Sequence, residues 1–404
     1  MDNKKKNTTQ LKPHCMVVHA YYPLDETRVE REAHALVAAG FEVDVLCLQD
    51  ENEPAEETVE GVHIYRLPVR RHKGQGLVVQ MLEYLSFFVL VFLKLLKLHP
   101  RRRYGTIQVH NLPDFLVFST IIQKLSGARI ILDLHDLMPE FFAGSYNRSM
   151  DSLPVKLLKL QERLSCWYAD RVITVTETWR QTLIKRGVPA HKTFVVMNLA
   201  DERVFGQDVN VDREANGRNG FRLIYHGTIA QRYGLDLLVE AVDQLKSDIP
   251  DIHLTIHGGG EFRDDLMKMV QERSLDKYVY FSVKRLPTSD LPKLIKSADI
   301  GVVPYRYDIF TDGILPTKLM EYAAVGVPVI ASRTSAITDY FDSQMVQLFS
   351  PGDVGELVSS IRLLYNDRQQ LLQYKQNIEK FNQRYNWKSV AAQYVQLIEQ
   401  LQKK

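Results

Sequence analysis

A lysine and a glutamate three residues apart on a short apolar segment are the most chemically suggestive feature of the sequence. Lys318 and Glu321 lie in TDGILPTKLMEYAAVGVPVIAS, residues 311–332. This pattern predicts a loop, a helix that begins at Pro316 and ends at Gly326, and then a buried strand. A cation in the first turn opposes the helix dipole, and a carboxylate among apolar residues is costly to bury. Both residues therefore call for a reason beyond helix formation.

A helix N-terminus that binds a diphosphate with a sugar attached would supply that reason. Free first-turn N–H groups and Lys318 would neutralise the diphosphate. The carboxylate of Glu321 would accept hydrogen bonds from ribose hydroxyls. The alternative is a Lys–Glu pair at i,i+3 on a solvated surface, and the local sequence leaves both interpretations open.

A second candidate phosphate contact lies upstream, in LIYHGTIAQRYGLDLLVEAV. The pattern predicts a strand that ends at His226-Gly227, a loop, and a helix that begins near Gly234. Glycine at such a turn lets the backbone approach a phosphate or a base. Arg232 in the loop would add a cation beside Lys318, and the alternative is a solvated loop arginine.

Two histidines follow predicted strands in the first half of the chain. His135 and Asp136 come after the run at 129–134, and His110 ends the run at 106–110. Ligands in open α/β sheets bind at the carboxyl ends of the strands, so these side chains are candidate cleft residues. Either histidine could instead cap or pack a loop.

The loop after the first predicted strand contributes two more candidates, Asp25 and Arg28. Arg28 could reach a phosphate in the cleft. It could equally pair with Glu32, one helical turn further along.

Several kinds of chemistry have no supporting motif in the sequence. The stretch HisGlyGlyGly at 257–260, followed by Glu261, also occurs in esterase oxyanion loops, but the chain has no GxSxG, which disfavours a hydrolase. It also lacks GxxxxGK[ST], HExxH and DxD. A bound diphosphate would therefore be neutralised by Lys318, Arg232 and helix N–H groups, with no metal required.

Apolar runs alternate with amphipathic stretches through both halves, which is typical of doubly wound parallel sheets. The polar, Gly- and Asn-rich segment 206–220 predicts a linker. We therefore expect an α/β protein of two Rossmann-like domains that face each other across a cleft. The predicted strands are 14–20, 41–48, 62–67, 106–110, 129–134, 171–175, 193–198, 221–226, 253–258, 278–283 and 299–304. The predicted helices are 26–39, 112–126, 154–168, 177–186, 235–246 and 261–273.

The composition fits a globular protein long enough for two domains, with 404 residues, 45% of them hydrophobic and 25% charged. The net charge of +2 argues against a nucleic-acid partner. Cys15, Cys47 and Cys166 show no metal-binding spacing, which predicts buried free thiols. The first residues lack an apolar segment, so we expect no signal peptide, a cytoplasmic location and an unused glycosylation sequon at Asn147.

Residues 77–98, LVVQMLEYLSFFVLVFLKLLKL, are almost wholly apolar apart from Glu83, Lys94 and Lys97. The uninterrupted part, Tyr84 to Leu93, is too short to span a bilayer. Basic residues flank the segment on both sides. We expect a helix that lies in an anionic membrane surface, peripheral to the inner face of the plasma membrane. The alternative is a core helix with a solvated basic rim.

The motif PTKLMEY followed by GVPVIAS resembles the nucleotide-sugar motif of the retaining glycosyltransferases of family 4, which have the GT-B architecture. Members often carry another glutamate eight residues before the one at Glu321, where this chain has Gly313 beside Asp312. Many also carry an arginine and a lysine at the positions held here by Thr228 and Tyr233. The replacement of the first glutamate concerns the contacts of the donor sugar, and Arg232 would take over as the diphosphate cation.

The resemblance implies a nucleoside-diphosphate-sugar donor as substrate, no cofactor, and His135 as the catalytic histidine beside the donor sugar. It implies a lipid-linked or glycan acceptor in exopolysaccharide, lipopolysaccharide or capsule assembly. The expected donor-binding residues are Gly227, Thr228, Arg232, Asp312, Gly313, Leu315, Thr317, Lys318 and Glu321. The expected domains are an acceptor domain at 1–205, the linker at 206–220, a nucleotide-sugar domain at 221–385, and a helix at 386–404 that crosses back to the first domain.

Two other functions fit the same fold expectation. A sugar-nucleotide 2-epimerase would share the nucleotide site but would need neither a lipid acceptor nor a membrane helix. A catalytically idle scaffold subunit would account for the residues at 228, 233 and 313.

Overall fold

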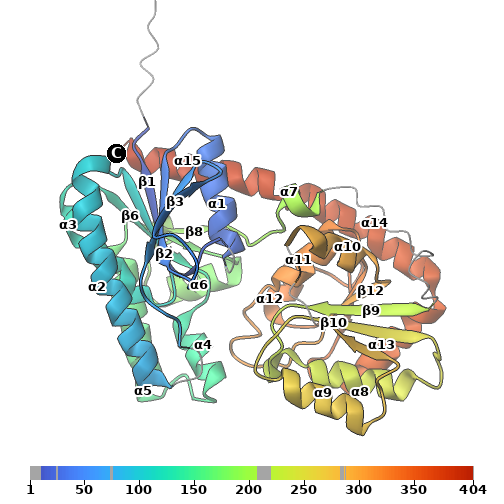
Figure 1. The fold of residues 1–404 in the computed structure, drawn as a ribbon. Coiled ribbons are helices and arrows are strands. Elements are labelled where there is room, and N and C mark those ends of the chain that lie inside the picture. The colour runs from blue at the N-terminus through green and yellow to red at the C-terminus, as the bar shows by residue number, and fades with distance from the viewer. Residues whose placement is uncertain are drawn as a thin grey trace, which may run out of the picture. The chain divides into compact units, whose positions relative to one another are not determined.

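The computed structural model describes residues 11–23, 26–72, 76–206, 220–282, 286 and 288–403. The chain divides into two compact units, each with its own sheet (Figure 1). Residues Met1–Met197 and Ser389–Lys404 form the first, and Asn198–Lys388 form the second. The first boundary thus falls before the predicted 205, since α7 (Glu202–Phe205) belongs to the second unit. Most of the predicted linker, 207–219, lies outside the described residues.

Eight strands form the sheet of the first unit, in the order β3-β4-β2-β1-β5-β6-β7-β8. All neighbouring pairs are parallel except β3 and β4. The edge strand β3 was not predicted, because it is mostly exposed and has no apolar alternation. The strands are β1 (His14–Tyr21), β2 (Val43–Leu48), β3 (Glu56–Val59), β4 (Val62–Leu67), β5 (Thr106–His110), β6 (Arg129–Leu134), β7 (Arg171–Thr174) and β8 (Thr193–Val195).

Helices cover both faces of this sheet. The helix predicted at 112–126 is divided into a 3₁₀ segment and a short α-helix, and the helix after β6 was not predicted. The helices are α1 (Thr27–Ala38), α2 (Leu77–Arg102), η1 (Asp114–Thr120), α3 (Ile121–Leu125), α4 (Met138–Ser145), α5 (Leu153–Tyr168), α6 (Glu177–Lys185) and η2 (Ala190–Lys192). The terminal helix α15 (Trp387–Gln402) docks on the same unit, where the Tyr394 hydroxyl donates a 2.6 Å hydrogen bond to Gln108. Cys15, Cys47 and Cys166 are buried free thiols, as predicted.

The second unit has six strands, all parallel, in the order β11-β10-β9-β12-β13-β14. The strands are β9 (Phe221–His226), β10 (Ile252–His257), β11 (Val279–Phe281), β12 (Ile300–Val303), β13 (Val329–Ser332) and β14 (Gln347–Phe349). The other helices of this unit are η3 (Gln231–Tyr233), α8 (Leu235–Leu245), α9 (Arg263–Glu272), η4 (Thr288–Asp290), α10 (Leu291–Lys296), α11 (Thr317–Ala324), α12 (Ser335–Thr338), α13 (Val354–Asn366) and α14 (Arg368–Arg384). Its core lies between the sheet and α8, α9 and α13. Both units are thus Rossmann-like α/β folds, as expected.

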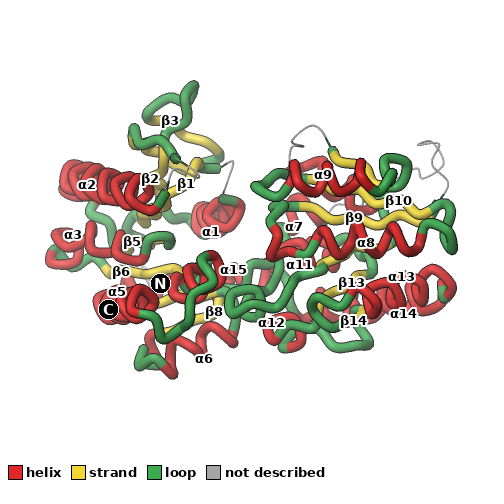
Figure 2. The backbone as a smooth tube through the Cα atoms, turned by 90° about the horizontal axis from the view of Figure 1, so that it is seen from below, coloured by secondary structure: helices red, strands yellow, loops and turns green. Residues whose placement is uncertain are grey.

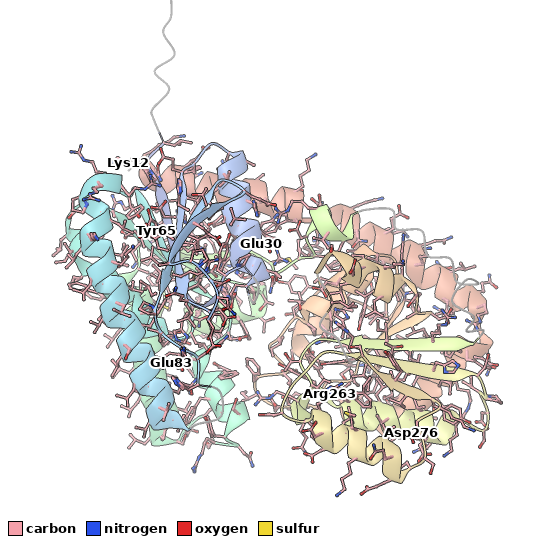
Figure 3. All side chains as sticks on the ribbon, viewed as in Figure 1. Lys12, Glu30, Tyr65, Glu83, Arg263 and Asp276 are labelled. Atoms are coloured by element: carbon pink, nitrogen blue, oxygen red, sulfur yellow. The ribbon has the colours of Figure 1, made fainter. Side chains whose placement is uncertain are left out.

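Helix α2 has one buried face and one exposed face. One face, which includes Phe87 and Val91, is buried against the unit, whereas Val78, Leu85 and Leu93 are exposed. Among the described residues α2 is a helix long and apolar enough to cross a membrane, judged by length and composition alone. Glu83, which interrupts the apolar run, turns inward and lies 3.0 Å from His19 (Glu83 is labelled in Figure 3). Whether this helix contacts a membrane stays a prediction.

Candidate active site

The predicted donor-binding residues gather at the carboxyl edge of the second sheet, where the strand order reverses between β9 and β12. Open α/β sheets bind ligands at this kind of position. Gly227 and Lys318 are close neighbours, since a Cβ on Gly227 would lie 3.4 Å from Lys318 Cε. The loop after β9 supplies Gly227, Thr228 and Arg232, the loop after β12 supplies Asp312, Gly313 and Leu315, and α11 supplies Thr317, Lys318 and Glu321.

Lys318 lies inside a group of three tyrosines. Its side chain is buried, and the ammonium donates a 2.7 Å hydrogen bond to the Tyr305 hydroxyl. The ammonium also lies 4.9, 5.2 and 4.9 Å from the ring centroids of Tyr225, Tyr233 and Tyr305. Such rings attract a cation through their negative faces. Tyr225 and Tyr305 were not predicted as site residues, because Tyr225 is part of the apolar strand β9 and Tyr305 comes shortly after the apolar strand β12.

Burial lowers the pKa of Lys318 from 10.5 to about 8, against a smaller raising effect of the Glu321 carboxylate. The ammonium form still predominates at neutral pH, although it is held at a cost. The alternative of a solvated Lys318–Glu321 pair is therefore wrong. The structure instead holds a nearly buried cation in the first turn of α11, where an anion would be stabilised by both the charge and the helix N-terminus.

Glu321 faces a histidine that was not predicted as a site residue. Its Oε2 is hydrogen-bonded to His226 Nε2, while His226 Nδ1 lies 3.1 Å from the Tyr322 hydroxyl. Tyr322 fits here because Gly301 has no side chain, since a Cβ on Gly301 would lie 2.5 Å from the Tyr322 ring. One carboxylate oxygen is thus oriented by His226. Whether ribose hydroxyls bind this carboxylate stays a prediction.

Asp312, which was predicted to contact the donor, is hydrogen-bonded to the first residue of α12. Its two carboxylate oxygens accept hydrogen bonds from the Ser335 backbone N–H and hydroxyl, each at 2.8 Å. Within the same loop, Asp308 Oδ1 accepts hydrogen bonds from the N–H groups of Phe310 and Thr311. The bonds to Ser335 fix the loop against α12, and a contact of Asp312 with the donor stays a prediction. Gly313 and Leu315 are buried in this loop.

Arg232 remains a candidate for the second phosphate-binding cation. Its guanidinium carbon lies 5.5 Å from the Phe310 ring centroid, and its carbonyl accepts a 3.0 Å hydrogen bond from the Arg306 N–H. The neighbouring Arg306 is neutralised by a bidentate pair with Asp236, at 2.6 and 2.8 Å. Arg232 is thus partly exposed and lies over a ring of the loop after β12, and its role as a phosphate contact stays a prediction.

The glycine turn after β10 packs directly on the loop after β9. Gly227 N–H donates to His257 O, and Ile229 N–H donates to Gly259 O, each at 2.9 Å. At Gly258, which has φ +138°, a Cβ would lie 2.0 Å from Gly227 O. The turn therefore sets the position of the Gly227 backbone beside Lys318.

Gly258→Ala is accordingly expected to lower the free energy of unfolding by more than about 2 kcal/mol, since it adds both a clash and backbone strain. Gly259→Ala is the matched control, because its Cβ would meet no atom within 4 Å. Urea unfolding of the two variants measures the difference. Equal midpoints would contradict the close packing of the two loops.

In the first unit, His135 and His110 lie together at the carboxyl ends of β5 and β6. His110 Nδ1 is 3.0 Å from His135 Nε2 and 3.3 Å from Asp133 Oδ2. The Asn111 side chain accepts the His135 N–H at 2.8 Å and donates to the Asp136 carbonyl at 2.6 Å. The structure thus unites three of the predicted cleft residues. Asp25 lies outside the described residues.

Arg28 is not available to a phosphate. It is buried and bonds both oxygens of Asp133, at 3.2 and 3.0 Å, and it lies 3.1 Å from Glu32. The predicted alternative, a pair of Arg28 with Glu32, is therefore confirmed. The predicted contact of Arg28 with a phosphate is wrong. The main partner, Asp133, was missed. Its signal was a lone carboxylate in the otherwise apolar strand RIILDL.

Burial lowers the pKa of His135 to about 3 and also lowers that of His110. The nearby Asp133 carboxylate acts in the opposite direction on both, and burial prevails. Both imidazoles are therefore neutral at physiological pH. His135, which is partly exposed, can offer a neutral ring as a donor or acceptor of hydrogen bonds.

His110, Asp133 and His135 also present three ligand atoms within 4.8 Å of one another. Among the described residues this group could hold a metal by spacing alone. However, Arg28 already bonds both oxygens of Asp133, so a divalent cation would lie beside a buried guanidinium. The charges therefore disfavour a metal at this position.

Two family models match the chain and together cover most of it. The Glycosyl transferase 4-like domain matches residues 26–198, and the Glycosyl transferases group 1 model matches residues 208–381. The two Rossmann-like units and the similarity to solved structures agree with these matches. The chain therefore belongs to the group 1 glycosyltransferases of GT-B architecture. It is therefore a glycosyltransferase enzyme.

Two related proteins have low sequence identity to this chain, but they align with most of its length. A protein of Escherichia coli K12 named for colanic acid biosynthesis, the glycosyl transferase WcaI, is 26% identical over 74% of this chain and 75% of its own length. Chitobiosyldiphosphodolichol beta-mannosyltransferase of Candida albicans is 23% identical over 85% of this chain and 79% of its own. These relatives act in polysaccharide and glycan biosynthesis.

Solved structures share the fold over nearly the whole chain. Sucrose-phosphate synthase from Thermosynechococcus elongatus aligns with a TM-score of 0.78 at 21% identity, covering 96% of this chain and 99% of that one. HepE of Anabaena, in complex with UDP and glucose, aligns with a TM-score of 0.72 at 16% identity, covering 96% and 100%. At these identities the likeness establishes the GT-B fold.

Proposed function

We propose that this glycosyltransferase moves a sugar from a nucleoside-diphosphate-sugar donor to a lipid-linked acceptor, with retention of anomeric configuration, in the synthesis of a cell-surface polysaccharide. The observation that carries the donor assignment is the buried Lys318 ammonium at the first turn of α11. No carboxylate lies within ion-pairing distance of it among the described residues. A buried cation of this kind is costly to hold, and a diphosphate would supply its counter-charge.

Lys318 has the central role in the proposed chemistry. Together with Arg232 and the first N–H groups of α11, it would stabilise the charge that develops on the leaving diphosphate. Glu321, oriented by His226, would accept a hydrogen bond from the ribose. No divalent metal is needed in this scheme, since protein cations and helix N–H groups supply the charge.

His135 is the proposed catalytic residue at the sugar, an assignment that rests on its resemblance to a family histidine. Because its ring is neutral at physiological pH, it would act as a hydrogen-bonding group for the reacting sugar rather than as a cation. We assign no carboxylate nucleophile, so retention would follow a same-face displacement guided by the leaving group. The anomeric configuration of the product, measured by NMR, tests this, and a product of inverted configuration would overturn it. That measurement matters because the C. albicans relative is named as a beta-mannosyltransferase.

The lipid-linked acceptor is supported by the names of relatives and by α2. One relative is named for an exopolysaccharide, colanic acid, and another for a sugar on diphosphodolichol. The exposed face of α2 suits a lipid surface, since Val78 and Leu82 are 74% and 60% exposed. We accordingly propose a cytoplasmic protein that is peripheral to the inner face of the plasma membrane.

The replacement at position 233 no longer favours the alternative of a catalytically idle scaffold subunit. Tyr233, which stands where many relatives carry a lysine, is one of the rings around the Lys318 ammonium. The residue at that position therefore contributes to the site. Donor binding without turnover would revive this alternative, and turnover to an epimeric sugar nucleotide without any acceptor would favour the 2-epimerase.

A thermal-shift panel with UDP-, GDP-, ADP- and dTDP-sugars tests the donor site. One nucleotide class is expected to raise the unfolding midpoint of the wild type, because a ligand that binds only the native state stabilises it. Glu321→Ala is expected to reduce this shift, while Glu272→Ala, on the exposed end of α9, should leave it unchanged. The donor assignment fails if no nucleotide shifts the folded wild-type protein.

A further inference from the structure

The side of the first unit formed by α2, α3 and α5 exposes many large apolar side chains. The three helices lie next to one another on the same side of this unit in both views (Figures 1 and 2). Contiguous apolar patches of this size on soluble proteins mark binding surfaces. We call this surface the apolar face, and its exposed residues are Leu77, Val78, Met81, Leu82, Leu85, Val89, Leu93 and Leu96 of α2, Ile121, Ile122 and Leu125 of α3, and Leu153, Leu157, Leu160, Leu164 and Trp167 of α5.

The contribution of α5 was not predicted from the sequence, and it is as regular as that of α2. The four leucines and Trp167 recur at i, i+4, i+7, i+11 and i+14, which puts them on one stripe of the helix. Leu153 is 71% exposed and Trp167 is 76% exposed. The opposite side of α5, which includes Val155 and Cys166, packs into the unit. The side chains of this stripe are therefore not part of the packing that stabilises the unit.

The helices of the apolar face carry their own acidic side chains inward, although the exposed Glu56 of β3 pairs with Lys94 of α2. The acidic residues in α2, η1–α3 and α5 are Glu83, Asp114 and Glu162, and all three are buried. Each has an inward partner, as Glu162 does with Arg186 at 2.9 Å. Because these helices expose cations and bury their acids, the same face of a second copy would be repelled by like charges.

The cations of the same elements are on the outside. Lys97, Arg101, Lys156 and Arg163 are exposed, and none of them has a salt bridge among the described residues. A groove of about 810 Å³ lies beside Trp167, between α5, which contributes Arg163, and the segment 187–192, which contributes Lys192. An apolar surface rimmed by unpaired cations is complementary to a bilayer with anionic headgroups.

We propose that α5 is a second lipid-contacting helix and that it binds an anionic bilayer together with α2, with Trp167 at the headgroup boundary. The inference deepens the membrane location in the proposed function and rests on it. Tryptophan suits this position because its ring is apolar and its N–H is polar. Two helices in contact with lipid define a surface, whereas α2 alone would leave the unit free to rotate about one axis.

The fluorescence of Trp167 reports directly on α5. The other two tryptophans, Trp179 and Trp387, are 2% and 9% exposed, so changes on vesicle binding arise mainly from Trp167. Vesicles of phosphatidylcholine and phosphatidylglycerol are expected to shift its emission to the blue, and brominated acyl chains to quench it. Trp167→Phe should remove both signals while the protein still floats with the vesicles. An unshifted spectrum on bound vesicles would overturn the inference, since α2 would then bind alone.

A charge placed in the stripe tests the energetic contribution. Leu157→Asp with Leu164→Asp is expected to weaken vesicle binding at least tenfold, because two charges would have to leave water. The control is Leu372→Asp on α14 of the second unit, a leucine that is 63% exposed and that should have no effect. Circular dichroism confirms folding of the variants. Vesicle binding equal to that of the wild type would contradict the proposal.

Three further outcomes separate the inference from the proposed function. Lys156→Glu with Arg163→Glu should reduce the preference for anionic vesicles, to which Lys97 and Arg101 still contribute, and leave the nucleotide thermal shift unchanged. A wild-type dimer that the leucine double variant dissociates, with no vesicle binding by either protein, would assign the face to a second copy and overturn the proposal. A wild type that inserts Trp167 but binds no nucleotide would overturn the donor site and support the lipid contact.

Discussion

Lys318→Met is expected to lower kcat/KM by about 10²–10³-fold, the range found when a group that stabilises developing charge is removed. Methionine keeps the length of the side chain and suits the tyrosine group, so the change removes the charge with little change in packing. Initial rates with the donor identified in the thermal-shift panel measure the effect. Lys293→Met, at an exposed position on α10, is the control and should retain full activity.

The same substitution is expected not to destabilise the protein. A pKa lowered from 10.5 to about 8 means that the folded protein disfavours the ammonium form, by about 3 kcal/mol for this shift. Removing the charge relieves that cost and loses one hydrogen bond to Tyr305, worth about 1 kcal/mol. An active variant, or an inactive one that is also strongly destabilised, would contradict a functional role for this cation.

The lowered pKa also gives a pH dependence of known sign. Between about pH 8 and pH 10.5 the unfolded chain keeps a proton on Lys318 that the free folded protein has lost, so the contribution of this group to stability rises with pH. Donor binding should do the opposite and weaken about tenfold per unit above pH 8, because binding then requires uptake of a proton. Isothermal titration in buffers of different ionisation enthalpy measures that uptake. Lys318→Met should show none.

Asp133→Leu is expected to lower the free energy of unfolding by about 3–5 kcal/mol, because it leaves the buried Arg28 guanidinium without its main counter-charge. Burial raises the pKa of Glu32, although the Arg28 guanidinium acts in the opposite direction, so this second carboxyl is the weaker counter-charge in the wild type. Hydrogen exchange in β1 and β6 measures the stability of this unit.

Glu32 lies 3.1 Å from Arg28 and could ionise once Asp133 is lost. Asp133→Leu combined with Glu32→Gln should therefore cost more than the sum of the two single changes. Arg362→Ala is the control, since it breaks an exposed pair with Asp248 and should cost no more than about 1 kcal/mol. Equal losses for the buried and exposed pairs would contradict the assigned counter-charge.

Much of the fold could be predicted because its strands are apolar runs. The parallel strands of both sheets, except β14, lie within a few residues of the predicted ranges, because buried strands exclude charge. The short strand β14 and the helices α10, α12, α13 and α14 were not predicted. The edge strand β3 and the short helix α4 could not be predicted in this way. Their residues are exposed or short, so no periodic signal marks them.

The candidate site was only partly predictable for a different reason. Lys318 and Glu321 were identified because they conflict with their local surroundings. Tyr305 and His226 were missed because they reach the site from other strands, and no local pattern marks a contact made across a sheet edge. Arg28 was ambiguous until the fold brought Asp133 against it, 105 positions along the chain.

The α/β class, the two-domain organisation and the segment that contains the candidate donor site could be predicted from sequence, because each follows from local periodicity and from residue types in conflict with it. The groups that surround Lys318, the bonds of Asp312 to Ser335 and the buried pairing of Arg28 became visible only in the folded protein. It alone also showed that the stripe on α5 is exposed. An apolar helix face looks the same in a sequence whether it packs inward or outward, because periodicity records which residues share a face and not what covers that face.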